Sequence, residues 1–391
     1  TASIVVHMEG DLTMTYLKPG LAAAVALAAL HSNAFAGGFS RGDANIDILF
    51  EDGKAAIDAG VTYVAPKRQF DTIDGVQSSD DPISKSYFVP NLAIKASISD
   101  SFSCALTYTQ PFGASSVYGP QANAAEAARI GNYAIEKGFT TNEYGGTCAV
   151  RFDAGPGRIH VIGGVFLQDF RYKAETFYGT LRLADDSAFG YRFGLAYDIP
   201  EYAMRAQLMY RSEVEHKVSG DFTPDALIPV VGTTPLPSDG IGTLPQSIKL
   251  SLQSGIAPDW LVYGSVEWTD WSILDALNYD IAVLGPQHDV YNWRDGWTVQ
   301  AGIGHKFNDL LSGTVNLTWD RGVGTGADIM SDTWTLGVGG ALKAGPGAFQ
   351  LGVGLSYLTA GEQSMANGAT YDATAGGDWA LGVSTSYRIK F

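Results

Sequence analysis

Residues that could perform catalysis are few in this chain, and their spacing does not bring a catalytic set together. Four histidines follow residue 36, and no two of them have the His-x-x-x-His spacing of a helical metal site: His160, His216, His288 and His305. A lipase or protease needs a histidine beside a serine or an aspartate on its surface. The alternation of side chains along the predicted strands places no such pair together. We therefore predict that the protein is not an enzyme and holds no cofactor.

The two cysteines, Cys104 and Cys148, are too few for a structural zinc site, which takes four ligands, and we predict no bound metal. They lie near the short-turn ends of two neighbouring predicted strands, and the alternation of the strands puts both on the same outer face. In an oxidising compartment they could form a cross-strand disulfide. The alternative is a pair of free thiols, because a disulfide is demanding in its geometry.

The composition excludes several classes of protein. The 391 residues include 41 acidic and 25 basic side chains, for a net charge of −16, which argues against a nucleic-acid-binding protein. Glycine is abundant (47 residues), and charged residues make up only 17% of the chain, against roughly 25% in soluble domains. Ample aromatic and aliphatic content argues against disorder. A soluble core with a charged surface fits these values poorly, and so does a helical membrane protein.

The N-terminal region has the features of an export signal. Met14 is followed by Lys18, by the apolar run Leu21–Leu30 and by the small-x-small sequence Ala34-Phe35-Ala36. This order predicts a signal peptide over residues 14–36, since ten apolar residues are too few to span a bilayer. Residues 1–13 are then an upstream extension and Gly37 begins the mature chain. A buried helix is the alternative.

The remaining chain alternates with a period of two. Apolar residues occupy every second position from Leu381 to Phe391, and Gly, Ser, Arg and Lys stand between them. Residues 189–199, 248–256 and 311–319 repeat the pattern. Such alternation is typical of β-strands that are wetted on one face only. A secreted β-sandwich would need a second apolar layer against which to pack.

Connection lengths indicate how these strands are arranged. Short connections built from turn formers, such as Ser99-Asp100 and Pro200-Glu201, alternate strictly with long ones. This alternation is the signature of an outer-membrane β-barrel, with both termini on the periplasmic side. We predict an all-β, antiparallel, fourteen-stranded transmembrane barrel over residues 54–391. Its strands are expected near 54–68, 85–98, 101–112, 140–153, 157–175, 185–199, 202–219, 246–256, 259–272, 292–307, 309–321, 331–343, 347–360 and 378–391.

Tryptophans near the predicted strand ends are expected to form the interfacial girdles of such a barrel. They are Trp260, Trp268, Trp271, Trp293, Trp297 and Trp319.

Four segments resemble one family of barrels. The sequence FVPNLAIKASISDSFSCALTYTQPFG is similar to the outer-membrane long-chain fatty acid transporter (FadL/TodX-type) family, with its Val-Pro-Asn at a strand start and Pro-Phe-Gly after the next hairpin. YRSEVEHKVSGDF, LPQSIKLSLQSGIAPDWLVYGSVEWTDWS and GWTVQAGIGHKFND resemble later segments of that family in the same order. The resemblance implies fourteen strands, ligand capture in a groove among extracellular loops, and passage through the barrel by diffusion without chemistry.

The resemblance also implies an N-terminal plug, but here the chain departs from the family. Only Gly37–Gly53 precede the first predicted strand, and the Asn-Pro-Ala motif of longer family plugs is missing. We expect a short plug with apolar contacts from Phe39, Ile46, Ile48, Leu49 and Phe50. A disordered periplasmic tail is the alternative, and the departure leaves a gating role open.

A fatty acid needs an apolar slot for its tail and cations or hydroxyls for its head group. The candidate slot consists of apolar residues in or next to the long loops 113–139 and 220–245: Phe112, Ile130, Ile135, Phe222, Leu227, Ile228 and Val230. Loop-on-loop packing is the alternative role of these residues. Candidate head-group cations face the lumen by alternation: Arg192, Arg205 and Lys249. Most lumenal cations, Arg211, Lys306, Arg388 and Lys390 included, are expected to pair with acids such as Asp198, Glu213, Glu215 and Glu267.

Pro111-Phe112-Gly113 ends the third predicted strand. Proline cannot donate to the ladder and glycine weakens it, so Pro111 and Gly113 predict a local break in strand pairing. The resemblance implies a lateral opening there, and an ordinary strand end is the alternative.

We therefore predict a monomeric channel in the outer membrane of a Gram-negative bacterium, in contact with its lipids and not with nucleic acid. Its ligand is expected to be a long-chain fatty acid or another hydrophobic small molecule. The alternatives are a hydrocarbon or aromatic-compound channel of the same family and a general polar-solute porin, although the long loops are apolar where a porin presents charges.

Overall fold

The structure, a computed structural model, describes residues 37–391. The predicted upstream extension, 1–13, and signal peptide, 14–36, lie outside the described residues. Within the described part, no helix is both long and apolar enough to cross a membrane.

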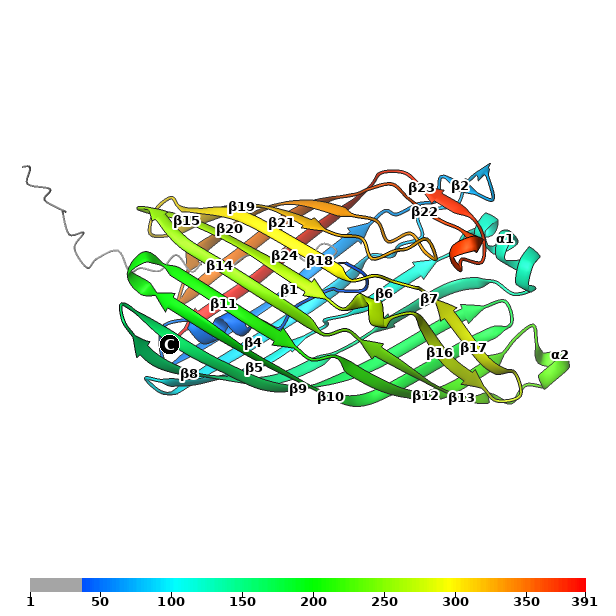
Figure 1. The fold of residues 1–391 in the computed structure, drawn as a ribbon, viewed down its shortest axis with the longest axis horizontal. Helices are drawn as coiled ribbons and strands as arrows, with labels where there is room; N and C mark the ends of the chain where they lie inside the picture. Colours follow the sequence, from blue (N-terminus) through cyan, green and yellow to red (C-terminus); the bar gives the residue numbers. More distant parts are fainter. Residues whose placement is uncertain (1–36) are drawn as a thin grey trace, which may run out of the picture.

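Fourteen antiparallel strands form a closed barrel, which confirms the predicted fold class (Figure 1). Closure is made by β1, whose residues pair with the last strand from Ala56 opposite Lys390 to Pro66 opposite Ala380. Closure pairs the first barrel strand with the last, as a barrel in lipid requires. The strands are β1 (Ala55–Pro66), β4 (Tyr87–Ser99), β5 (Phe102–Thr109), β8 (Glu143–Ala154), β9 (Gly157–Thr176), β10 (Gly179–Ile199), β11 (Met204–Arg211), β14 (Ser247–Ala257), β15 (Trp260–Thr269), β18 (Gly296–Lys306), β19 (Leu311–Asp320), β20 (Thr333–Ala344), β21 (Gly347–Leu358) and β24 (Asp378–Lys390).

Short connections join these strands at one end, here called the turn end, and long ones at the other, the loop end. Two pairs of strands, β9 with β10 and β12 with β13, extend the wall beyond the barrel at the loop end (Figure 1). The added strands are β6 (Gly113–Val117), β7 (Ala134–Thr140), β12 (Val214–Pro224), β13 (Leu236–Leu244), β16 (Ala276–Ile281) and β17 (Gly285–Val290). A small separate sheet contains β2 (Thr72–Ile73), β3 (Val76–Gln77), β22 (Gly361–Gln363) and β23 (Ala373–Ala375).

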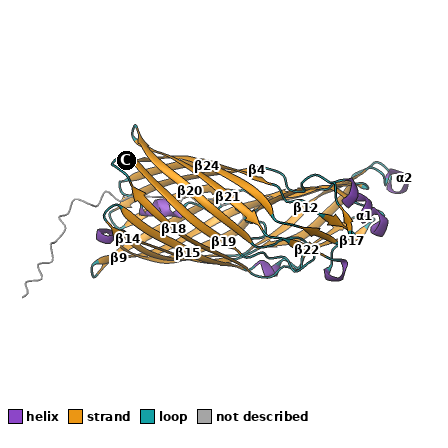
Figure 2. Cartoon of the chain, turned by 90° about the horizontal axis from the view of Figure 1, so that it is seen from above, coloured by secondary structure: helices purple, strands orange, loops and turns teal. Residues whose placement is uncertain are grey.

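Helices are few and short. Helices α1 (Pro120–Ile130) and α2 (Ile228–Val231) lie beyond the strands at the loop end (Figure 2). Four 3₁₀ turns complete the structure: η1 (Ile46–Phe50), η2 (Pro200–Tyr202), η3 (Trp271–Ile273) and η4 (Met365–Asn367). Of these, η1 lies inside the barrel, where Ile48 is fully buried.

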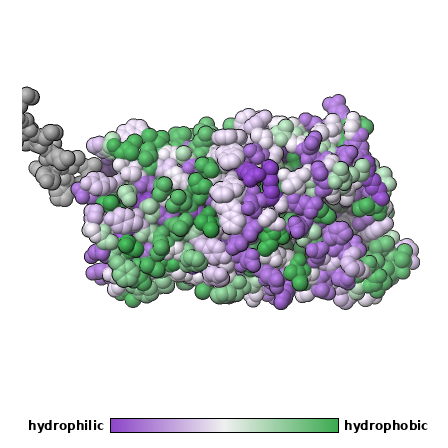
Figure 3. Space-filling model, in the orientation of Figure 1, coloured by the Kyte–Doolittle hydropathy of each residue, from purple (hydrophilic) through white to green (hydrophobic). Residues whose placement is uncertain are grey.

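The outer surface carries an apolar band around the barrel. On β10 the exposed side chains alternate as Phe189, Tyr191, Phe193 and Leu195, because every second residue of a strand points outward. Figure 3 shows apolar side chains gathered over the part of the barrel nearer the turn end and hydrophilic ones increasing toward the loop end. The band is the surface that lipid would cover.

One predicted strand, 202–219, is divided in the structure. Its first part, β11, pairs with β14, and its second part, β12, pairs with β13 at the loop end. The ladder breaks at Ser212 and Glu213, which lie between the two strands, and the alternation shifts there by one residue. Glu213 and Glu215, predicted to face the lumen, are therefore exposed.

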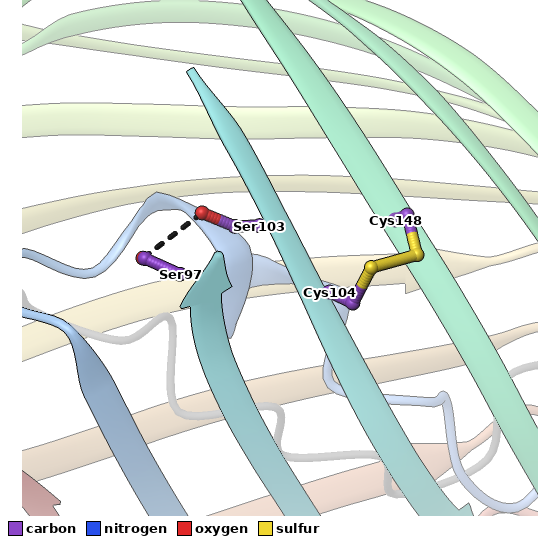
Figure 4. The surroundings of a disulfide bond; sticks show 4 residues. All are labelled: Ser97, Ser103, Cys104 and Cys148. Carbon is purple, nitrogen blue, oxygen red and sulfur yellow. Dashed lines mark hydrogen bonds between the residues drawn. A yellow bond between two sulfur atoms is a disulfide. The ribbon is translucent and has the colours of Figure 1, made fainter. Parts of the chain in front are cut away.

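The outer face near the turn end carries a disulfide. Cys104 of β5 stands directly opposite Cys148 of β8, and a bond joins their sulfur atoms (Figure 4). The neighbouring outer residue Leu106 is exposed, as expected on the lipid-facing side of the wall.

Candidate functional site

Residues 37–53 run through the lumen, and small side chains of the wall make room for them. Ile48 and Leu49 of η1 pack against inward-facing side chains of seven neighbouring strands, most of them alanines. A larger residue at these wall positions would take the volume that η1 occupies. Burying Ile48 completely is worth about 1.5–3 kcal/mol relative to its exposure. The wall residues are Ala56, Ala93, Ala105, Ala149, Ile162, Ala196 and Met209, and Ile46 and Phe50 pack against the same cluster.

Carboxylates of this lumenal segment neutralise cations of the wall. Asp43 lies 2.7 Å from Lys249 Nζ, and Asp47 lies 3.5 Å from Arg205 Nη2. Nearer the turn end, Glu51 pairs with Arg388 and with Lys390. Two candidate head-group cations, Arg205 and Lys249, thus face the lumen and contact acids of the lumenal segment.

The third candidate cation, Arg192, belongs to a buried triad. Its guanidinium and that of Arg211 both donate to Glu143, the latter at 2.8 Å. The Glu143 side chain is only 2% exposed. One carboxylate therefore pairs with two guanidinium groups inside the barrel, and the triad keeps a net positive charge. Of the other predicted partners, Asp198 pairs with Arg158 and His160, and Lys306 with Asp309 in the adjacent turn.

A buried aromatic cluster lies near the loop end. The ring of Phe39 lies 4.5 Å from that of Trp293, 5.0 Å from that of Phe139 and 6.0 Å from that of Trp271, measured between centroids. The contacts with Phe139 and Trp271 are edge-to-face, and aromatic pairs of this kind each add roughly 0.5–1.5 kcal/mol beyond area burial. Phe112, Phe170, Tyr172 and Tyr291 belong to the same cluster.

Two of the tryptophans predicted to form the interfacial girdles, Trp271 and Trp293, are not at the outer surface of the barrel. Trp271 and Trp293 are 1% and 4% exposed and lie in this inner cluster. Both stand outside regular strands, where alternation no longer sets the direction of a side chain. Trp260 and Trp297 are exposed, together with Trp334 and Trp379.

Strand pairing is interrupted at Pro111. Strand β5 ends at Thr109, opposite Asn91 of β4, and β6 begins only at Gly113. Between them the wall pairs with the lumenal segment: Arg41 N–H donates to the Pro111 carbonyl at 2.8 Å, and Gly113 N–H donates to the Phe39 carbonyl at 2.9 Å. Ser40 and Phe112 form an isolated bridge between these bonds. We call residues 39–42 and 110–113 together the seam.

On the side of β4 that faces the seam, Tyr87, Phe88, Val89 and Pro90 have no partner strand. Pairing resumes farther toward the loop end, where Lys85 N–H donates to the Ser115 carbonyl. The hydrogen-bond ladder between β4 and the neighbouring wall is thus interrupted beside Pro111 and Gly113.

Two cavities border the seam. The smaller, about 130 Å³, lies in the lumen between residues 40–47, the Glu143 triad and the pair formed by Lys249 and Glu267. The larger, about 860 Å³, is lined by Arg41 and Tyr87 and extends along β6, β7, β9, β10 and β12. Phe112 lines the smaller cavity and Phe139 the larger one.

The candidate residues of the loop end fall into separate places. Phe112 and Phe222 are buried in the aromatic cluster, and Leu227 packs against it. Ile228 and Val230 of α2 are exposed, the latter at 76%. Helix α1 turns Ala122 and Ala125 toward Phe70 and Tyr371 in a second small core. Its last residue, Ile130, is exposed, and Ile135 is half-buried on β7.

A half-buried ion pair supports the loop end. Lys137 of β7 donates to Asp289 of β17 at 2.6 Å, and the Tyr172 hydroxyl donates to the same carboxylate at 2.9 Å. Burial alone would raise the pKa of Asp289, but Lys137 and these hydrogen bonds bring it below its ordinary value. The pair joins two elements that are far apart in the sequence.

Catalytic geometry is not found among the described residues. Gly38–Gly42 matches Gly-x-Ser-x-Gly letter for letter, but Gly38 and Phe39 lie in a turn and Ser40 bridges to Phe112, so the segment is not a strand–turn–helix elbow. His216 bonds to Asp185 at 3.0 Å and to Gln168 at 3.1 Å, without a serine. Burial lowers the pKa of His216. No group of three or more potential metal ligands occurs within residues 37–391.

Sequence reasoning did not single out Arg41 or Glu143, and it assigned Trp271 and Trp293 to the interfacial girdles instead of the inner cluster. Arg41 stands in a segment without periodicity, and Glu143 at the start of a strand, where its partners on other strands cannot be read from the order of residues. The only available signal was the presence of one arginine in an otherwise acidic stretch, residues 37–53.

Residues 179–375 match the model of a protein family described as outer membrane protein transport protein (OMPP1/FadL/TodX). No curated protein sequence matches the chain. Among solved structures, a Pseudomonas aeruginosa FadL homologue is similar over 88% of this chain and 92% of its own, with a TM-score of 0.70 and 13% identity. The toluene transporter TodX of P. putida is similar over the same shares, with a TM-score of 0.58 and 13% identity. The Ralstonia pickettii toluene transporter TbuX covers 88% and 90%, with a TM-score of 0.56 and 11% identity.

Proposed function

Because the chain belongs to the family of outer membrane transport proteins that includes FadL and TodX, we propose that it is a passive channel for long-chain fatty acids or similar hydrophobic compounds. Ligand is captured among the loops at the loop end, enters the barrel and leaves past the seam. The mature protein begins at Gly37 after removal of the signal peptide, and it works as a monomer in the outer membrane of a Gram-negative bacterium.

The observation that carries this proposal is the apolar cluster near the loop end. The cluster around Phe39, Trp271 and Trp293 presents buried aromatic rings where a water-filled pore would be lined by polar side chains. Such a cluster favours a solute that exchanges contacts with aromatic rings over one that must keep its hydration shell. A general polar porin is supported less well for this reason.

Capture is assigned to the exposed apolar residues at the loop end. Ile228 and Val230 project from α2 into solvent, and exposed apolar patches on soluble surfaces mark binding sites. Leu227 joins this helix to the aromatic cluster. A ligand held on α2 therefore has a continuous apolar surface leading toward the lumen.

A channel for aromatic hydrocarbons is the second candidate. It is favoured by the composition of the cluster, since stacked rings such as Phe139 and Phe170, 5.1 Å apart, suit a flat aromatic ligand. TodX and TbuX, which share the fold, are described as toluene transporters.

Uptake in a strain that lacks the gene tests the proposal. Radiolabelled oleate, toluene and a small polar sugar are supplied to the deletion strain with and without the full-length gene. Restored oleate uptake without a change in sugar uptake is expected. Restored toluene uptake alone would favour the second candidate, and restored sugar uptake alone would refute the hydrophobic channel.

A further inference from the structure

Arg41 differs from the other buried arginines of the barrel. Arg68, Arg192 and Arg388 are each paired with a carboxylate, from Asp378, Glu143 and Asp58 respectively. Arg41 is 5% exposed, yet no described carboxylate lies within ion-pair distance of it and no described residue accepts a hydrogen bond from its guanidinium. Its Nε is buried without any partner.

The surroundings hold this guanidinium in place without neutralising it. Its Cζ lies 3.9 Å from the centre of the Tyr87 ring, a cation–π contact. On the other side it fits against Gly113, where a Cβ atom would come within 2.7 Å of Cζ. The backbone N–H of Arg41 is tied to Pro111. A buried charge without a counter-charge is unfavourable, so an anion that reached the guanidinium would be held strongly.

The position of Arg41 makes such an anion accessible. The residue lines the cavity of about 860 Å³ and stands where β4 has no partner strand. Phe139 and Leu183 line the same cavity. An alkyl chain can lie against these apolar residues while its charged end reaches Arg41. A guanidinium presents paired N–H groups that match the two oxygens of a carboxylate.

We propose that Arg41 binds the carboxylate of an amphipathic acid as it passes the seam, so that the channel takes hydrophobic monocarboxylates in preference to hydrocarbons of the same length. The inference rests on the proposed function and narrows its ligand class. The inference also gives the lumenal segment a role in ligand binding. Arg41, which would bind the acid, is the residue whose backbone N–H donates to Pro111 in the seam.

Binding of decanoate and 1-decanol to the full-length protein in lipid nanodiscs tests this assignment, with empty nanodiscs measuring partition into lipid. R41Q is expected to weaken decanoate binding roughly tenfold to hundredfold, the range of a hydrogen-bonded charge, and to leave decanol binding unchanged. R41K keeps the positive charge but loses the paired N–H groups of the guanidinium. Its affinity for decanoate is therefore expected to lie between those of the parent and R41Q. Acetate should not compete, since it lacks the chain.

Arg151→Gln is the matched control, because it removes the same charge from β8 near the turn end, far along the chain from the seam. It should bind decanoate like the parent. Equal decanoate binding by R41Q and the parent overturns the assignment, and so does an equal loss of both ligands in R41Q, which would mean that Arg41 only supports the fold. If the parent binds neither ligand, the proposed function fails as well.

Discussion

At the scale of single residues, several charged side chains of the interior have more than one partner. Glu143 serves two arginines at once, and Asp289 serves a lysine and a tyrosine. Removing one member of such a group leaves a buried charge without compensation. The loss of folding free energy on removing one member is therefore larger than the net contribution of the intact set of paired charges to stability.

Glu143→Gln is expected to destabilise the barrel by about 3 kcal/mol, because two guanidinium groups lose their only common counter-charge. Urea unfolding in detergent, followed by heat-modifiable migration on gels, measures the change. Glu215→Gln is the control, because Glu215 is exposed and its contact with Lys217 is 3.7 Å long. A surface pair of that kind contributes about 0–1 kcal/mol. Equal effects of the two substitutions would contradict the buried role of Glu143.

Asp328 makes the loop between β19 and β20 sensitive to pH. Burial raises the pKa of Asp328 to about 7 in spite of the hydrogen bond that it accepts from Trp293 at 2.9 Å. The folded loop then binds more protons than the open loop between the ordinary pKa of an aspartate, roughly 4, and pH 7. Loop stability is accordingly full below that window and falls as pH rises through it.

Hydrogen exchange of residues 321–332, corrected for intrinsic rates, is expected to show stronger protection at pH 5 than at pH 8. Asp328→Asn should remove the difference, since the amide stays neutral at both pH values. Greater protection at pH 8 in the parent would show that the carboxylate is stabilised by charge and not penalised by burial.

At the scale of elements, the disulfide ties together two neighbouring strands of the barrel. It joins β5 to β8 over a separation of 44 residues. A loop of that length predicts about 4 kcal/mol of stabilisation through the entropy of the unfolded chain. The double substitution of Cys104 and Cys148 by serine is expected to lower the urea midpoint without altering the folded barrel. Thiol labelling of the unfolded, unreduced parent should find no free cysteine, and two reactive thiols would refute the bond.

The barrel strands could be predicted because the alternation of apolar and polar residues can be seen in each strand by itself. In β10 and β24 one face meets lipid and the other the lumen, so the order of residues alone states the direction of every side chain. The extra strands at the loop end lack this contrast. Val218 and Phe222 of β12 face a core made by other loops, and nothing in the local sequence names those loops.

The candidate site could be predicted only in part, for the same reason. Pro111 and Gly113 indicate a break in strand pairing through their backbone chemistry, whichever residues lie opposite them. Arg41 and Phe39 depend on contacts across more than 70 residues of chain, with Gly113, Phe139 and Trp293. Such contacts follow from closure of the barrel and not from any local pattern.

At the scale of the whole molecule, part of the excess of acidic residues lies inside the barrel. The lumenal segment carries Asp43, Asp47 and Glu51 into a wall that presents Arg205, Lys249 and Arg388. The chain has a net charge of −16, yet the wall of its lumen presents cations, which the carboxylates of the lumenal segment pair with. The segment fills the barrel sterically and also balances its inner charge.

Removal of residues 39–51 is therefore expected to open the barrel and to make it anion-selective. The deletion takes away the aromatic closure at Phe39 and the three carboxylates that neutralise the wall. Full-length protein in planar bilayers should conduct little, whereas the deleted chain should show a several-fold larger conductance and a reversal potential that favours chloride over potassium. Adding Lys249→Gln to the deleted chain should reduce the preference without reducing the conductance, because it removes a wall cation and leaves the bore unchanged. Equal conductance of the full-length and deleted chains would show that residues 39–51 do not block the lumen. A cation preference in the deleted chain would show that the wall acids, among them Glu267 and Asp58, outweigh the cations that the segment leaves behind.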